Sequence, residues 1–135
     1  MARAPPGKDS MSSVEQITAV VREYVSRLST GTSADIAALY ADDATVEDPV
    51  GGEVRRGRDA IAAFYGPLDS VDNSAELLVI RASDTWAAFH MRVTTTTPDQ
   101  VITVEPIDVM TFDTDGRITS MRAFWSPGDF VISAR

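Results

Sequence analysis

The stretch Val101-Ile-Thr-Val-Glu-Pro-Ile-Asp-Val-Met-Thr-Phe112 alternates in the manner that is typical of a β-strand. Because alternate side chains of a strand point to opposite faces, one face carries Ile102, Val104, Pro106, Asp108, Met110 and Phe112. Asp108 is the one ionisable group in this apolar row. A buried carboxylate without a partner is unfavourable and usually takes up a proton instead. The pattern therefore predicts that Asp108 is a buried, neutral carboxylic acid.

Strand-like sequence continues on both sides of this stretch. Runs at residues 75–81, 86–95 and 118–125 have strand character, and short turn sequences separate them. The first half of the chain has helical periodicity instead, in three segments that begin near residues 13, 33 and 58. Helices followed by antiparallel strands predict an α+β domain. We expect three helices on a curved, mixed, mainly antiparallel β-sheet, forming a cone with an apolar pocket between the layers.

Two polar side chains in the first half of the chain are predicted to face inward. Tyr24 shares the spacing i, i+4, i+7, i+11 with three aliphatic residues, so it lies on the buried face of the first helix. A short strand over residues 44–48 ends before Pro49, and alternation puts Asp48 on the same face as Ala44 and Val46. A tyrosine and two carboxyl groups are therefore candidates for a site inside the cone.

The composition excludes several classes of protein. A chain of 135 residues with a formal net charge of −8 has no basic stripe for a nucleic acid. It contains no Cys and one His, which excludes thiolate and multi-histidine metal sites. No apolar run reaches the ~20 residues of a membrane span, and the first ten residues do not form a secretory signal. We expect a soluble, cytoplasmic protein without a membrane partner.

The length is that of one domain with one hydrophobic core. Residues 1–12 are polar and contain a Pro-Pro pair, so we expect a disordered N-terminal extension. The domain is predicted to span residues 13–127. Residues 128–135 are expected to be a short tail whose Phe130 and Ile132 are available for packing.

Three stretches of the chain together resemble the steroid Δ5-3-ketoisomerase (ketosteroid isomerase) family, one of the cone-shaped folds named after nuclear transport factor 2. The first is Tyr40-Ala-Asp-Asp-Ala-Thr-Val-Glu-Asp-Pro-Val50, and the second is residues 57–65. The third is residues 106–125, from Pro106-Ile-Asp-Val-Met-Thr-Phe112 to Gly116-Arg-Ile-Thr-Ser-Met-Arg-Ala-Phe-Trp125. The likeness covers residues 13–127 and is weak between residues 67 and 100.

The resemblance implies an activity and a role for each candidate residue. The family moves the C5–C6 double bond of 3-oxo-Δ5-steroids to C4–C5, works as homodimers, and uses no metal or organic cofactor. A neutral aspartic acid beside a tyrosine is a known property of ketosteroid isomerases. Asp48 matches the general base, and Tyr24 and Asp108 match the two donors to the oxyanion. The remaining matches are a hydrogen-bond network of Tyr40 and Tyr65, and an apolar substrate-binding wall of Phe64, Met110, Met121 and Trp125.

Each assignment has a structural alternative. Tyr24 alone would be read as a core tyrosine whose hydroxyl finds a backbone partner, and Asp48 before Pro49 as a turn residue. Asp108 has the alternative of a salt bridge to Arg122, which would keep its carboxylate charged. A non-catalytic module that binds small apolar ligands or dimerises needs none of these roles. A hydrolase or cyclase on the same fold would need additional polar groups to position water.

Overall fold

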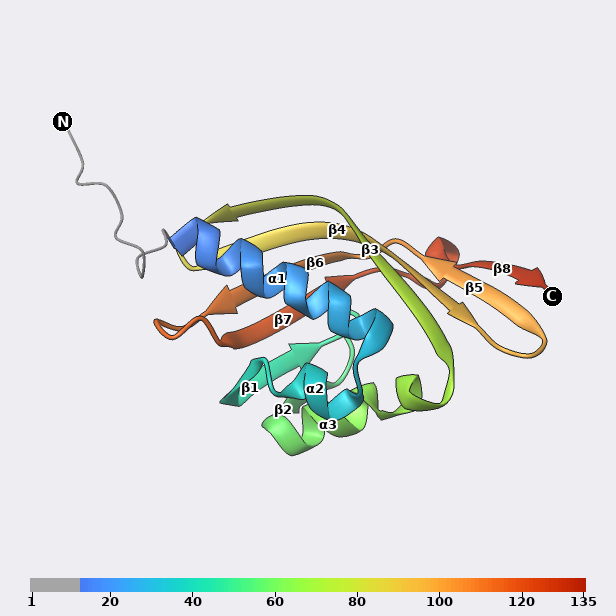
Figure 1. The fold of residues 1–135 in the computed structure, drawn as a ribbon, viewed down its shortest axis with the longest axis horizontal. Helices are drawn as coiled ribbons and strands as arrows, with labels where there is room; N and C mark the ends of the chain where they lie inside the picture. The colour runs from blue at the N-terminus through green and yellow to red at the C-terminus, as the bar shows by residue number, and fades with distance from the viewer. Residues whose placement is uncertain (1–12) are drawn as a thin grey trace.

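The computed structural model describes residues 13–135, so the expected disorder of residues 1–12 lies outside the described residues. The prediction of an α+β fold is confirmed: three helices pack on a mixed, mainly antiparallel sheet of eight strands (Figure 1). The helices are α1 (Ser13–Thr30), α2 (Ser33–Ala37) and α3 (Arg58–Tyr65), followed by the short 3-10 helix η1 (Gly66–Ser70). The strands are β1 (Tyr40–Glu47), β2 (Val54–Arg56), β3 (Asp72–Ser83), β4 (Trp86–Thr96), β5 (Gln100–Val104), β6 (Ile107–Phe112), β7 (Ile118–Phe124) and β8 (Val131–Ala134).

The sheet has the strand order β2-β1-β7-β6-β4-β5-β8, and β3 pairs with β4. The pair β1–β7 is parallel, and the other strand pairs are antiparallel. The first half of the long strand β4 pairs with β6, and its second half pairs with β5. The long, curved β4 therefore joins the two parts of the sheet that form the wall of the cone (Figure 1).

The single strand predicted over residues 101–112 is wrong in one respect. The stretch forms two strands, β5 and β6, and Glu105 and Pro106 lie between them. Proline has no N–H to donate to a neighbouring strand, so it does not continue a central ladder. The chain keeps its direction, and the carbonyl of Pro106 still accepts a bond of 3.4 Å from the N–H of Met91 on β4. The face predicted for Asp108 is therefore preserved across the break.

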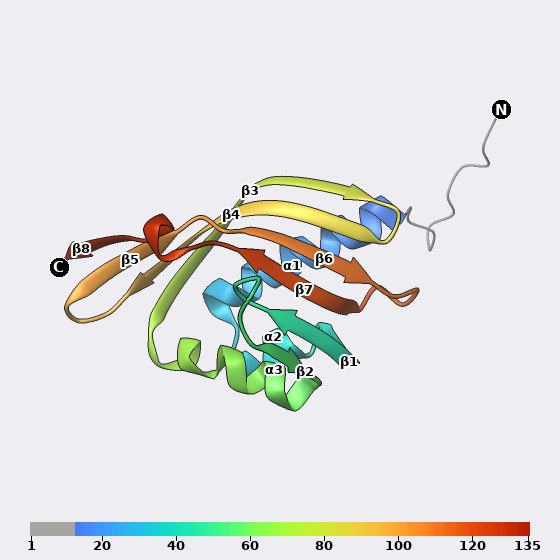
Figure 2. The same ribbon diagram turned by 180° about the vertical axis from the view of Figure 1, so that it is seen from behind.

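All three helices lie on one face of the sheet, as the two opposite views show (Figures 1 and 2). The predicted inward face of α1 is confirmed, since Ile17, Val21, Tyr24 and Leu28 are buried. On β6 the buried side chains are Asp108, Met110 and Phe112, as alternation predicted. The face that the helices cover therefore brings Tyr24 and Asp108 into the same interior. No helix within residues 13–135 is long and apolar enough to cross a bilayer.

The last segment of the chain is more regular than the sequence indicated. Residues 128–135, expected as a tail, include β8, which pairs with β5 in the register Thr103↔Val131 and Gln100↔Ala134. A 3-10 turn, η2 (Pro127–Asp129), leads into this strand. The segment therefore extends the sheet at its edge beyond β5.

Candidate active site

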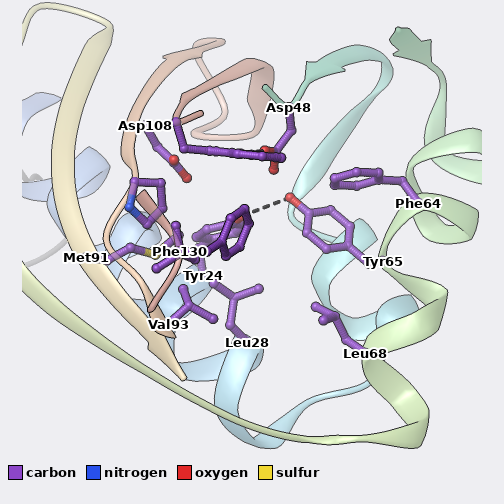
Figure 3. Close-up of a pocket in the computed structure, with 13 residues that line it drawn as sticks. Tyr24, Leu28, Asp48, Phe64, Tyr65, Leu68, Met91, Val93, Asp108 and Phe130 are labelled. Carbon is purple, nitrogen blue, oxygen red and sulfur yellow. Dashed lines mark hydrogen bonds between the residues drawn. The ribbon is translucent and has the colours of Figure 1, made fainter. Parts of the chain in front are cut away.

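A partly open cavity of about 250 Å³ lies between the helices and the sheet. Figure 3 shows the side chains that line it. Its walls come from α1, from α3 with η1, from strands β4, β5 and β6, and from the chain just after β1 and after β7. They consist of Tyr24, Leu28, Asp48, Phe64, Tyr65, Leu68, Met91, Val93, Val104, Pro106, Asp108, Trp125 and Phe130. The walls are mainly apolar, and their hydroxyl and carboxyl groups belong to two tyrosines and two aspartates. This composition suits a flat, apolar molecule with a single polar end.

Asp108 is the buried polar residue at the centre of the site. Its exposed fraction is 1%, and neither carboxyl oxygen has a hydrogen-bond partner. Its neighbours across the ladder are Phe89 on β4 and Ala123 on β7, which offer no charge. Burial raises the pKa of Asp108 well above its usual value, and the negative charge of Asp48 raises it further. We therefore expect the acid to be neutral at neutral pH, with a hydroxyl free to donate into the cavity.

The alternative of a salt bridge between Asp108 and Arg122 is wrong. Arg122 pairs across the ladder with Val109, so its side chain leaves the sheet on the face opposite to Asp108. Its side chain is 65% exposed, and its Nε lies 3.6 Å from Oε1 of Glu47 on β1. No cation therefore neutralises Asp108 among the described residues 13–135.

Three buried tyrosines form a chain of hydrogen bonds that ends at the cavity. The hydroxyl of Tyr65 lies 2.8 Å from that of Tyr24 and 2.8 Å from that of Tyr40 (Figure 3 marks the first bond). Burial raises the pKa of all three phenols well above 10, so they are neutral. The bond from Tyr65 lowers the pKa of Tyr24, as a donated bond would. Either hydroxyl of each pair can donate; donated in the order Tyr40 to Tyr65 to Tyr24, the bonds leave the proton of Tyr24 for a ligand.

Asp48 follows the end of β1 and continues the inward face of Ala44 and Val46. Its Oδ1 accepts a hydrogen bond of 2.5 Å from Nε1 of Trp125. Burial raises the pKa of Asp48, while the indole bond and the charge of Arg55 oppose that rise. Asp48 and Asp108 lie on the same side of the cavity (Figure 3). The pKa of Asp48 is therefore raised less than that of Asp108, and we expect Asp48 to ionise while Asp108 stays protonated.

Arg55 supplies positive charge near Asp48 without lining the cavity. It lies on β2 opposite Val46, and its guanidinium carbon is 4.5 Å from the centroid of the Phe64 ring. Its side chain is 28% exposed, and its ion pair with the exposed Glu53 is 3.4 Å long. A weak ion pair of this kind leaves most of the field of the guanidinium available to Asp48. The sequence pattern carried no signal for this role, because β2 is short and polar.

The apolar wall was predicted in part. Phe64 and Trp125 line the cavity, whereas Met110 and Met121 do not and instead pair with each other across β6 and β7 in the core. Alternation gives the direction of a side chain but not its depth, and Met110 lies two residues further along β6 than Asp108. The prediction missed Leu28, Leu68, Met91, Val93, Val104, Pro106 and Phe130 as lining residues. Alternation with Asp108 had already placed Val104 and Pro106 on its face.

The arrangement is suited to moving a proton on carbon. One carboxyl group that can ionise faces an apolar space, and a neutral acid and a phenol in the same space can donate to an oxygen. Such donors stabilise the oxyanion of an enolate. Within residues 13–135 no group of three or more His, Cys, Asp or Glu side chains is placed to hold a metal ion.

Comparisons with known proteins identify the family of the chain and a relative whose name fits this chemistry. The SnoaL-like domain family matches residues 21–121. A protein from Nocardioides simplex called "Steroid Delta-isomerase" is 57% identical over 118 residues, which cover 87% of this chain and 96% of that protein. Among solved structures, the epoxide hydrolase/cyclase-like enzyme SalBIII, of pyran ring formation in the polyether salinomycin, superposes with a TM-score of 0.81. It is 26% identical, and the match covers 88% of this chain and 97% of SalBIII.

Proposed function

We propose that this chain, which belongs to the SnoaL-like domain family and is a steroid Δ-isomerase, moves the C5–C6 double bond of 3-oxo-Δ5-steroids to C4–C5. The observation that carries the proposal is Asp108, a buried carboxyl group without a partner, in the same apolar cavity as Asp48. A neutral acid there has a use as a donor to an oxyanion, and it has no structural partner that would explain it otherwise.

Asp48 serves as the base that carries the proton. Its carboxylate removes a proton from C4, between the ketone and the double bond, and the electron pair moves to the ketone oxygen to give a dienolate. The same carboxyl group then returns its proton to C6, and the double bond settles between C4 and C5. The indole of Trp125 holds one carboxylate oxygen, which leaves the other to face the steroid. A positioned base contributes roughly 10²–10⁴-fold to the rate.

Tyr24 and Asp108 hold the oxygen of the dienolate. Both are buried and both line the cavity. Both are neutral, so each carries a proton that it can donate in a hydrogen bond. In an apolar cavity, donors fixed at the developing oxyanion stabilise it more than water does. The hydroxyl of Tyr65, 2.8 Å from that of Tyr24, can donate to it and so leave the proton of Tyr24 for the ligand.

The two ends of the tyrosine chain are expected to differ in their effect on catalysis. Tyr24→Phe removes a donor to the oxyanion and is expected to lower kcat by roughly 10²–10³-fold. Tyr40→Phe removes one equally buried hydroxyl and one equal bond to Tyr65, but it is expected to cost less than about tenfold. Initial rates of enone formation measure both. Equal losses in the two variants would contradict the assignment of Tyr24 as the donor.

Removal of the charge of Arg55 is expected to shift the pH dependence of the reaction. Asp48 must be ionised to act, so activity rises with pH through its pKa. Arg55→Gln removes a charge that lowers this pKa, and the acid limb of kcat/KM should therefore move to higher pH. On that limb we expect a loss of roughly twofold to fivefold, with little loss on the plateau. Arg56→Gln, on the exposed side of the same strand, is the matched control and should leave the profile unchanged.

The outer face of the sheet supports the homodimer that the family resemblance implies. Trp86, Ile107 and Phe124 are each about half exposed, and Ile107 pairs directly with Phe124 on the face that carries no helix. Exposed large apolar side chains on one face are typical of a protein interface. The homodimer and a cytoplasmic location remain predictions.

The isomerase assay on the purified wild-type protein tests the proposed function. A Δ5-3-ketosteroid is mixed with the protein, and the absorbance of the conjugated enone should rise at once. Tight binding of the steroid without any isomerisation would favour the non-catalytic binding module instead. The likeness to SalBIII raises the alternative of a cyclase or hydrolase, which would need additional polar groups in the cavity to position water. Beyond the groups assigned above, these walls carry no side chain that could position a water molecule.

A further inference from the structure

The segment that follows β7 places a single side chain against the site. Among residues 126–135, Phe130 alone is partly buried, while every other residue of the segment is exposed. Phe130 lines the cavity (Figure 3). Its ring packs edge to face against the indole of Trp125, with 5.0 Å between centroids and an angle of 75° between planes. Ten residues of chain thus bring one aromatic ring to the side of Trp125.

Phe130 is held from both sides along the chain. Before it, the backbone N–H of Ser126 donates to Oδ2 of Asp129 over 2.7 Å, and the N–H of Asp129 donates to the carbonyl of Ser126 over 2.9 Å. After it, β8 pairs with β5 along four residues. The chain end is tied as well, because the N–H of Arg135 donates to the carbonyl of Asp99 over 3.0 Å. A turn and a strand therefore hold the ring of Phe130 in place.

The indole that Phe130 contacts is the hydrogen-bond donor to Asp48. Trp125 is only partly buried, so the protein does not enclose its ring completely. An aromatic ring packed edge to face restricts this freedom and adds to the stability of the arrangement. Phe130 itself does not pack against the main core cluster, whereas Trp125 does. The contact therefore does more for the orientation of Trp125 than for the packing of the domain.

We propose that Phe130 is a positioning residue, which holds Trp125 in the orientation that donates to Asp48. This inference rests on the proposed function, since it concerns the base of the isomerisation. Without Phe130 the indole would leave the donating orientation for part of the time. The carboxylate of Asp48 would then lose both its alignment to the steroid and a hydrogen bond that favours its charged form.

The pH dependence is part of the expected result, because several groups act on Asp48. Trp125 donates to it from the end of β7, and the charge of Arg55 acts from β2. Asp108 on β6 and the tyrosines of α1 and α3 are neutral, so they contribute no charge at neutral pH. With Arg55 unchanged, weakening of the indole bond should raise the pKa of Asp48.

The test uses Phe130→Ala in the full chain, with Val131→Ala as the matched control. Val131 is the next residue, 67% exposed, and does not line the cavity. Phe130→Ala should lower kcat by roughly threefold to tenfold and move the acid limb of kcat/KM to higher pH, while Val131→Ala stays like the wild type. Phe130→Leu should recover most of the rate. In a double-mutant cycle, Phe130→Ala should add little to Trp125→Phe, because both act through the same bond.

A readout without turnover separates this inference from the proposed function. In a background with Trp86→Phe, the fluorescence comes from Trp125, and Phe130→Ala should shift its emission to the red. An inactive wild-type protein would overturn the proposed function, and the position of Phe130 would still be tested by the emission. If the emission, the acid limb and kcat of Phe130→Ala all match those of Val131→Ala, the inference is wrong. Full additivity with Trp125→Phe would also overturn it.

Discussion

Asp48→Asn is expected to lower kcat for isomerisation of a Δ5-3-ketosteroid by roughly 10²–10⁴-fold while the fold remains intact. The amide has almost the shape of the carboxyl group but cannot take a proton from C4. Its carbonyl oxygen can still accept the bond from Nε1 of Trp125, so the local structure has no reason to change. Binding of a steroid product should therefore survive the loss of turnover.

The matched control for this variant is Asp43→Asn. Asp43 lies on β1, the strand that leads to Asp48, and is exposed, so it tests the effect of losing one negative charge without touching the cavity. Initial rates of enone absorbance and the thermal unfolding transition are measured for both variants. Turnover at the wild-type rate by Asp48→Asn would remove Asp48 as the base. A large loss in Asp43→Asn would show that net charge, not the position of the base, controls the rate.

Two replacements of Asp108 are expected to separate a neutral donor from an anion. Asp108→Asn keeps a neutral group with N–H donors at the same place, so the loss in kcat should stay near tenfold. Asp108→Leu has a similar volume and no donor, and it should lose roughly 10²–10³-fold. The ratio of the two rates is the informative quantity. Equal losses in Asn and Leu variants would mean that the proton of Asp108 is not donated to the oxyanion.

Asp108→Leu, although it lowers activity, should raise the stability of the fold. The folded-state pKa of Asp108 is raised above that of the unfolded chain, so the unfolded chain binds fewer protons once the pH exceeds about 4. The contribution of Asp108 to the free energy of unfolding therefore falls as pH rises from there towards the folded-state pKa. Asp108→Leu removes this slope and the unpartnered polar group, and it should stabilise the fold at neutral pH by about 1–3 kcal/mol. Urea unfolding at several pH values measures this.

The sequence was sufficient to predict much of the site because two side-chain periods were clear. The period of the helix placed Tyr24 inward, and alternation placed Asp48 and Asp108 on inner faces. Burial of a lone carboxyl group in an apolar row was enough to predict its neutral state. These properties depend on local pattern and on the energy of desolvation, and both can be read from a single chain.

The contacts that depend on distant parts of the chain could not be read in this way. Trp125 donates to Asp48 across 77 positions in the sequence, and an indole in an apolar pattern gives no sign of its partner. The pairing of β8 with β5, which places Phe130, joins segments about 30 residues apart, and the alternation of neither segment predicts it. The depth of Met110 below the cavity follows from the curvature of the sheet. Each of these features is set by tertiary geometry, which the periodicity of a local segment does not report.

The protonation state of Asp108 is the central claim, and a carboxyl titration tests it most directly. The protein is labelled with ¹³C at the side-chain carboxyl carbon of aspartate, and Asp108→Asn assigns the resonance. Its chemical shift should remain that of a neutral acid at neutral pH, because burial and the charge of Asp48 raise the pKa of Asp108. A resonance that titrates near the ordinary aspartate value of about 4 would contradict the account, because an ionised Asp108 cannot donate to the dienolate.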